Sequence, residues 1–315
     1  MSRTKAHVSR VSAGILFAFV LLAAAAAQSN PNQVATLRWY PAITALSFPV
    51  AAGPYGVAFD GANIWVAGYS SLTLTKVRAN DGLVLSTISI PSGAFGLAYD
   101  GANIWVTAYP SNIVTKVRGR DGAILGTFTA GQGAFAAAFD GTNIWVTNSY
   151  DNTVSKLRAS DGANLGNFAV GTWPSSVVFD GAAVWVGNYS SDSVTKLRTD
   201  GRVLGTFKAG SPQGMAFDGA NVWVANSLSG TVTKLRASDG LFLGSFAVGA
   251  QPEGMVFDGT NVWVANLNSN TVSKLRASDG ATLGTFATPA GPLYLAFDGD
   301  NVWVSDLYNA SVSKM

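Results

Sequence analysis

A nine-residue motif dominates the sequence and restricts the folds that the chain can adopt. The motif reads Ala-Phe-Asp-Gly-Ala-Asn-Ile-Trp-Val at residues 58–66, and it returns with few changes around six later aspartates. A fixed period of about 40 residues is typical of propellers, solenoids and other repeat arrays. The chain therefore consists of one sequence unit repeated seven times. Successive motif aspartates are 40, 40, 40, 38, 40 and 40 residues apart, at Asp60, Asp100, Asp140, Asp180, Asp218, Asp258 and Asp298.

Each repeat divides into four short β-strands. In the unit around Asp140, strand-like runs cover residues 136–140, 144–147, 153–158 and 165–170, and Asp-Gly pairs between runs favour tight hairpins. Beyond the N-terminal segment there is no helical periodicity, which excludes a solenoid of helix pairs, and a β-helix would need shorter rungs. We therefore predict an all-β fold, a seven-bladed β-propeller of four-stranded antiparallel blades.

The two ends of the repeat region predict how the ring closes. The last repeat stops at residues 311–315, one strand short of a full blade. Residues 43–50 resemble the fourth strand of other units, so we expect this N-terminal strand to complete the C-terminal blade and remove open sheet edges. Residues 34–38 resemble the third strand and compete with residues 311–315 for that position. We favour the C-terminal segment, because a short hairpin ties it to its blade.

The N-terminal segment has the pattern of a secretory signal peptide. Three basic residues precede an apolar run at residues 13–27, and the run ends in alanines that suit signal peptidase near Ala27. The alternative is a retained anchor, but this run is shorter than the roughly 18–20 residues that a membrane span needs. We expect export to the periplasm or the extracellular space, with no membrane attachment after cleavage.

These boundaries give a signal peptide at residues 1–27, a peripheral segment at 28–42 and one propeller domain at 43–315. Removal of the signal leaves 17 basic and 18 acidic residues, because three of the 20 Lys and Arg residues lie in it. Such a near-neutral chain without a basic stripe argues against nucleic acid as a partner. The sequence has no cysteine, and its one histidine, His7, lies in the signal. The mature chain therefore has neither residue for catalysis.

The repeated side chains have structural interpretations. We expect Trp65 and its six counterparts to fill the space between blades. Asp60 and Gly61 should form a tight turn in which the carboxylate accepts backbone N–H groups. One such turn offers too few oxygens for calcium, so we expect no metal site. Each Lys-x-Arg pair, such as Lys76 and Arg78, should cover apolar surface with its stems while the charges reach water or a neighbouring acid.

Functional residues are expected where the repeats differ, in two loops per blade that reach one face around the central channel. One loop connects the fourth strand to the next unit, and the other joins the second and third strands. An aromatic concave surface with few polar groups is the usual form of a ligand site, although drift of loop residues around a structural ring is the alternative. The candidate ligand-binding residues are Tyr55, Tyr69, Phe95, Tyr109, Phe135, Asn148, Trp173, Asn188, Tyr189, Gln213, Asn226, Glu253, Asn266 and Asp306.

The sequence of the repeats resembles that of a known group of proteins. Gly-Pro-Tyr-Gly-Val-Ala-Phe-Asp-Gly-Ala-Asn-Ile-Trp-Val, with later Thr-Val-Thr-Lys-Leu-Arg and Leu-Gly-Thr-Phe segments, is similar to bacterial YVTN/NHL-type β-propeller repeats. These repeats overlap in sequence pattern with those of the virginiamycin B (streptogramin) lyase-like superfamily. The resemblance covers residues 43–315 and implies the propeller fold.

For the lyases the resemblance implies a His and a Glu as acid–base groups, with bound magnesium. Here the general base is missing, because the chain departs from both positions. The lyase His belongs to a Gly-Pro-His-Gly segment, and the equivalent position of this chain is occupied by Tyr55, Phe95, Gln213 or Glu253 in different blades. The lyase Glu stands three residues after the repeated Trp, and the equivalent position of this chain is occupied by Asn148, Asn188, Asn226, Asn266 or Asp306.

Three functions remain open. The leading hypothesis is a secreted, non-enzymatic propeller that binds a protein, glycan or small-molecule ligand through the variable loop face, as a monomer and without a cofactor. The second is a lyase-like or hydrolytic enzyme that uses Glu253 and Asp306, as a carboxylate pair or around a divalent cation. The third is a structural surface or matrix protein that self-associates. Common nucleophile motifs and phosphate-binding loops are absent.

Overall fold

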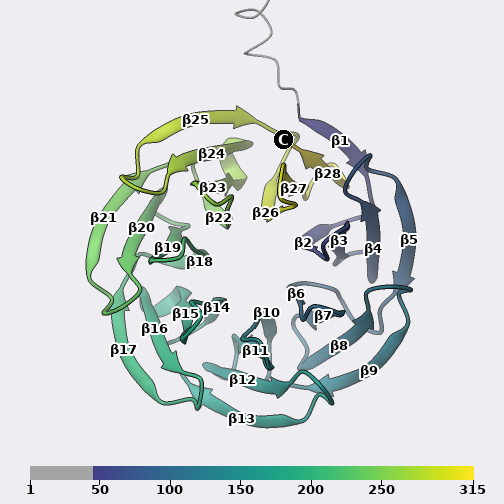
Figure 1. Ribbon diagram of the computed structural model, residues 1–315, viewed down its shortest axis with the longest axis horizontal. Helices are drawn as coiled ribbons and strands as arrows, with labels where there is room; N and C mark the ends of the chain where they lie inside the picture. Colours follow the sequence, from purple (N-terminus) through teal and green to yellow (C-terminus); the bar gives the residue numbers. More distant parts are fainter. Residues whose placement is uncertain (1–44) are drawn as a thin grey trace, which may run out of the picture. The chain divides into compact units, whose positions relative to one another are not determined.

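The structure, a computed structural model, describes residues 45–315. They form seven four-stranded antiparallel sheets around a common axis (Figure 1). Six sheets consist of four consecutive strands each, and the seventh combines strands from both ends of the described range. The predicted seven-bladed β-propeller is confirmed. The assignments of residues 1–27 and 28–42 lie outside the described residues.

The blades are numbered along the chain, and each runs from an innermost to an outermost strand. Two short 3-10 turns, η1 (Tyr189–Ser191) and η2 (Leu267–Ser269), follow second strands. No helix within residues 45–315 is long and apolar enough to cross a membrane. The strands are, in blade 1, β2 (Pro54–Phe59), β3 (Asn63–Gly68), β4 (Thr73–Arg78) and β5 (Val84–Ser89); in blade 2, β6 (Leu97–Tyr99), β7 (Asn103–Ala108), β8 (Ile113–Arg118) and β9 (Ile124–Thr129); in blade 3, β10 (Ala134–Phe139), β11 (Asn143–Asn148), β12 (Thr153–Arg158) and β13 (Asn164–Ala169); in blade 4, β14 (Pro174–Phe179), β15 (Ala183–Asn188), β16 (Ser193–Arg198) and β17 (Val203–Lys208); in blade 5, β18 (Pro212–Phe217), β19 (Asn221–Asn226), β20 (Thr231–Arg236) and β21 (Phe242–Ala247); in blade 6, β22 (Pro252–Phe257), β23 (Asn261–Asn266), β24 (Thr271–Arg276) and β25 (Thr282–Ala287); and in blade 7, β26 (Pro292–Phe297), β27 (Val302–Asp306), β28 (Ser311–Lys314) and β1 (Leu46–Pro49).

Blade 7 closes the ring in the predicted way. Strand β1 pairs antiparallel with β28, so the C-terminal segment supplies the third strand and the N-terminal segment the fourth. The ring of Phe48 lies 5.5 Å from that of Trp303, which matches the 5.4 Å between Trp105 and Phe128 within blade 2. The competing residues 34–38 lie outside the described range.

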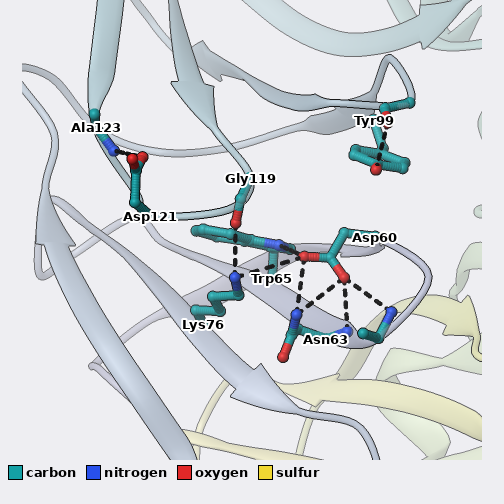
Figure 2. A network of polar contacts seen from close by, with 10 residues as sticks. Asp60, Asn63, Trp65, Lys76, Tyr99, Gly119, Asp121 and Ala123 are labelled. Atoms are coloured by element: carbon teal, nitrogen blue, oxygen red, sulfur yellow. Dashed lines mark hydrogen bonds and ion pairs between the residues drawn. The ribbon is translucent and has the colours of Figure 1, made fainter.

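The repeated turn holds its tryptophan through one carboxylate (Figure 2). Oδ1 of Asp60 accepts hydrogen bonds from the backbone nitrogens of Ala62 and Asn63, at 3.0 and 2.7 Å. Its Oδ2 accepts the indole Nε1–H of Trp65 at 2.7 Å, and this indole contact recurs in all seven blades. The predicted turn is confirmed, and the same carboxylate satisfies the donor of a buried indole.

The lysine of the third strand joins neighbouring blades. Nζ of Lys76 lies 5.0 Å from the ring centroid of Trp65 and donates a 2.6 Å hydrogen bond to the backbone oxygen of Gly119 in blade 2 (Figure 2). Asp60 Oδ2 is 3.9 Å from the same nitrogen. The expectation of an acidic neighbour therefore holds, but the main partner is the backbone of the next blade. An ammonium over each of the seven indoles adds a cation–π contact.

The innermost strands approach one another closely around the axis. A Cβ added to Gly214 of β18 would lie 2.0 Å from the backbone oxygen of Glu253 in β22. Glycines in the same position of other blades meet the next backbone in the same way, for example Gly56 against Phe95 at 2.4 Å. Glycine permits this approach because it has no side chain. These close contacts fix the innermost strands relative to one another. The innermost strands in turn set the positions of the loop residues at their ends.

Candidate functional site

Two kinds of loop lie against each other at one end of the ring. In blade 4 the backbone nitrogen of Tyr189, after β15, donates a 2.9 Å hydrogen bond to the backbone oxygen of Trp173, before β14. In blade 6 the backbone nitrogen of Leu267 donates to the oxygen of Gln251 in the same way, at 2.9 Å. The loops that vary along the sequence therefore form one hydrogen-bonded rim, which we call the mouth.

An aromatic row follows the mouth from blade 1 to blade 4. Neighbouring ring centroids lie 4.4–5.9 Å apart, a separation that favours aromatic pairs. Tyr150 was missed from the sequence because it stands one residue beyond the two loop positions compared. It connects the row through a 2.8 Å contact between its hydroxyl and that of Tyr109. The row comprises Tyr55, Tyr69, Phe95, Tyr109, Phe135, Tyr150 and Trp173.

The row ends at a hollow of about 410 Å³ that spans blades 3 to 6. Aromatic side chains form its wall, and amides, hydroxyls and one carboxylate supply its polar groups. The sequence prediction contained five of its residues: Phe135, Trp173, Tyr189, Gln213 and Glu253. The structure adds Ser190, Ser227 and Gln251.

The central channel lies beside the hollow and has a smaller cavity. Its cavity has a volume of about 130 Å³, and Phe135 and Gln213 line both spaces. Tyr294 of β26 lines the channel at a position where the other six blades have Gly, Ala or Ser. Burial, together with the nearby Glu253 carboxylate, raises the pKa of Tyr294 far above its usual value. The phenol is therefore neutral, and blade 7 makes the channel asymmetric.

Glu253 is the buried acid of the hollow, with 4 % of its surface exposed. Its Oε1 accepts hydrogen bonds from Nε2 of Gln251 at 2.9 Å and from Oγ of Ser227 at 3.2 Å. Burial raises the pKa of the Glu253 carboxyl to about 7, although these donors and Gln213 lower it in part. The group can therefore change its charge near neutral pH.

Two residues of the hollow have a left-handed backbone. The φ angles of Trp173 and Gln251 are 55° and 53°. In blades 1, 3 and 7 the equivalent residue before the inner strand is glycine, with φ of 67°, 73° and 79° at Gly53, Gly133 and Gly291. A bulky residue in this region costs roughly 1 kcal/mol or more relative to glycine. Blade 5 has the small Ser211 at this position, with φ of 47°. Folding alone therefore gives no reason for an indole or a long amide there.

The four candidate asparagines point into their own blades. Oδ1 of Asn148 accepts a 3.0 Å hydrogen bond from the backbone nitrogen of Gly131, and its Nδ2 donates to Thr153 and Ser155 at 2.9 and 2.8 Å. The other three are buried in the same arrangement. All of them anchor the loop between blades, so Asn148, Asn188, Asn226 and Asn266 do not enter the site that we propose.

Asp306 takes the place of these asparagines in blade 7. Its Oδ2 accepts hydrogen bonds from Ser313 and Ser311 at 2.6 and 3.3 Å, while its buried Oδ1 has no donor. The residue equivalent to Gly131 is Pro289, which has no N–H group to offer. Burial raises the pKa of the Asp306 carboxyl to about 7. Asp306 is fully buried, so a ligand at the mouth cannot touch it.

The structure does not join Glu253 and Asp306 in one hydrogen-bond network. Of the two, only Glu253 lines the hollow. Within residues 45–315 there is no group of three or more His, Cys, Asp or Glu that could hold a metal ion. What the hollow offers is an aromatic wall, several amides and hydroxyls, and one carboxylate.

Comparisons with known proteins show the fold class. No family model matches the chain, and no curated protein matches its sequence. The chain is similar to a streptogramin B lyase structure with a TM-score of 0.74 and 16 % identity, over 85 % of this chain and 96 % of that one. It is also similar to a hydrazine synthase from Kuenenia stuttgartiensis, with a TM-score of 0.74 and 15 % identity, over 84 % and 96 % of the two chains. The predicted likeness to lyase-type propellers is confirmed for the fold.

Proposed function

We propose that the protein is an exported, non-enzymatic propeller that binds a small ligand in the hollow at its mouth. One observation carries this proposal: Trp173 and Gln251 line the hollow in a left-handed backbone conformation, at a position that glycine occupies in blades 1, 3 and 7 and the small Ser211 in blade 5. Non-glycine residues in such conformations concentrate at active and ligand sites, where the surrounding structure holds the strained backbone in place. The proposed export rests on the sequence pattern of residues 1–27.

The loops hold the side chains of the hollow before any ligand arrives. The backbone nitrogen of Trp173 donates to Oδ1 of Asn152 at 2.9 Å, and its oxygen accepts from Tyr189. The indole packs edge-on against Tyr150, with 5.5 Å between ring centroids. A wall that is already ordered loses little conformational entropy on binding, which favours affinity.

Calorimetric titration of the purified protein with a panel of glycans, short peptides and small metabolites tests this function. We expect a binder whose affinity falls at least about tenfold in Trp173→Gly, since an anchoring aromatic contributes more than 1 kcal/mol. Tyr308→Ala is the matched control, because Tyr308 is an exposed aromatic of blade 7 outside the hollow. A ligand that binds both variants and the wild type equally would remove the hollow as the site.

We do not extend lyase activity to this chain. The comparison protein that carries that name shares 16 % identity, which supports a common fold only. In this sequence the single histidine is His7, within the proposed signal. The carboxylate alternative needs Asp306, whose side chain is fully buried in blade 7.

Self-association is a second candidate function, favoured by an apolar belt on the outer strands. Its members expose 41–58 % of their surface, and the outer strands present unpaired edges. Light scattering across a concentration series tests this: the belt predicts a mass that grows with concentration and that Phe242→Lys reduces. A constant monomer mass would exclude it. The belt consists of Leu83, Val84, Leu85, Ile124, Leu125, Leu165, Val203, Leu204, Leu241, Phe242, Leu243 and Leu283.

A further inference from the structure

The hollow contains one unbalanced charge. Glu253 is its only charged residue, because none of the other lining residues is Lys, Arg, His or Asp. The hydrogen-bond donors of Glu253 are neutral amides and a hydroxyl from Gln251, Gln213 and Ser227. A buried carboxylate is costly unless a cation accompanies it. The described residues around the hollow do not supply that cation.

The neighbouring titratable groups do not supply one either. Burial raises the pKa of Tyr55 and Tyr294, two phenols from blades 1 and 7, and the nearby Glu253 carboxylate adds to the rise. Both phenols are uncharged near neutral pH, since their pKa values start from 10 and move upward. No Lys or Arg contributes to the pKa of Glu253.

We propose that the ligand is an organic cation, a quaternary ammonium or guanidinium group, whose charge lies between the Glu253 carboxylate and the aromatic wall of the hollow. This inference rests on the proposed function and names its ligand class. The wall consists of Trp173, Tyr189 and Phe135, and the faces of such rings attract cations, most strongly when the site is partly desolvated. The carboxylate supplies the long-range attraction and the rings supply the close contact.

A neutral sugar explains the hollow less well. A sugar would also use an aromatic wall and amides, but it would leave the Glu253 charge uncompensated. The volume of about 410 Å³ admits a cationic group with several attached heavy atoms and is too small to hold a folded domain. The ligand is therefore a small cation or a single cationic side chain of an extended peptide.

The charge state of Glu253 makes the binding depend on pH. A cation binds to the carboxylate form, so affinity should rise between about pH 6 and about pH 8, and binding at about pH 6 should release a proton. Ser227, Gln251 and Gln213 do not titrate, so Glu253 is the group responsible.

The experiment compares choline with 3,3-dimethylbutan-1-ol, its neutral isostere, by calorimetric titration of the whole protein at about pH 8. We expect choline to bind about tenfold more tightly or better, in line with a desolvated cation–π contact beside a carboxylate. Glu253→Gln keeps the size of the side chain and should remove this preference and its pH dependence. Trp173→Gly should weaken both compounds. Asp161→Asn, an exposed carboxylate of an outer turn, is the matched control and should change neither.

Three outcomes would overturn the inference. They are the absence of choline binding, equal binding of the two compounds, and a preference that survives in a folded Glu253→Gln protein. In each case a sugar or neutral metabolite from the wider panel that still depends on Trp173 would leave the proposed function in place. Circular dichroism and thermal melting of each variant separate loss of binding from loss of folding.

Discussion

The indole nitrogen of Trp145 donates a 2.7 Å hydrogen bond to Oδ2 of Asp140, five residues earlier in the same hairpin. Oδ1 of the same carboxylate accepts the backbone nitrogens of Thr142 and Asn143 at 2.8 and 2.6 Å. One side chain thus fixes both the turn and the ring that packs between blades. Because this arrangement occurs seven times, it is the main local device that holds the propeller together.

Asp140→Asn should therefore destabilise the protein. The amide can still accept the backbone hydrogens, but its NH₂ group then faces the indole N–H, and two donors are left without acceptors. We expect a loss of about 2 kcal/mol in the free energy of unfolding, measured by chemical denaturation. Asp161→Asn, which removes an exposed ion pair with Arg158, should leave the free energy of unfolding close to the wild-type value, because solvent screens such pairs. Equal losses in both variants would contradict the role of the Asp–Trp contact.

The two buried carboxyls predict how stability changes near neutral pH. The pKa values of Glu253 and Asp306 are raised from 4.5 and 3.8 to about 7. Between the unfolded and folded values the folded state binds more protons, so stability should fall as pH rises from about 4 to about 7. Asp306→Asn should abolish part of this fall and gain on the order of 2 kcal/mol at about pH 8. Melting temperatures across pH check this, and an unchanged pH profile in Asp306→Asn would contradict it.

The turn aspartates predict the opposite trend in acid. Hydrogen bonds from the indole, the asparagine and the backbone outweigh burial and lower the pKa of Asp140 below its usual 3.8. The same direction holds for Asp60, Asp100, Asp218, Asp258 and Asp298. Their contribution is complete above the unfolded value and is lost as pH falls through the folded value. We expect steep acid unfolding below about pH 4, and a protein that melts at the same temperature at about pH 2 and about pH 5 would refute this.

Trp173→Gly separates stability from binding. Glycine suits the left-handed backbone at this position, which offsets the loss of the contact with Tyr150, so the free energy of unfolding should change by less than about 1 kcal/mol. Trp173→Ala removes the same indole but keeps the backbone strain, so it should be less stable than Trp173→Gly. Denaturation curves of the two variants, side by side, give the comparison. If the alanine variant were the more stable, the strain argument would fail.

Phe48→Ala tests the closure of the ring. Phe48 packs on Trp303 at 5.5 Å and joins the cluster that contains Ile64 and Val312. The loss of this partly buried ring should cost about 2 kcal/mol in the free energy of unfolding. Leu46 lies on the same strand but is 62 % exposed, so Leu46→Ala should change stability by less than about 0.5 kcal/mol. Similar effects of the two changes would show that β1 contributes little to closure.

The repeats alone were enough to predict the fold. The spacing of the Asp-Gly turns defined four strands per unit. The last repeat ends at residues 311–315, one strand short, and this predicted the closing blade. These inferences succeed because each depends on local turn chemistry and on a pattern that recurs seven times. The burial of Trp65 followed in the same way, since a tryptophan repeated in every blade is explained by packing between blades.

The site could be predicted only in part, because a loop position does not reveal the direction of its side chain. Asn148 and Tyr150 are two residues apart, yet the first is bonded inside the blade and the second lies on the mouth. Asp306 was grouped with Glu253 for its charge, but its partners Ser311 and Ser313 lie across a hairpin within the blade. The left-handed backbone of Gln251 has no signal of its own in the sequence. A comparison with the glycines at the same place in other repeats would have suggested it.

A crystal structure of the protein with choline tests most directly whether a cation binds in the hollow at the mouth. We expect electron density for the trimethylammonium group within about 6 Å of the Trp173 or Tyr189 ring centroid, on the side of the hollow where Glu253 lies. Density for choline elsewhere on the propeller, or a hollow that holds only water at a saturating choline concentration, would contradict it.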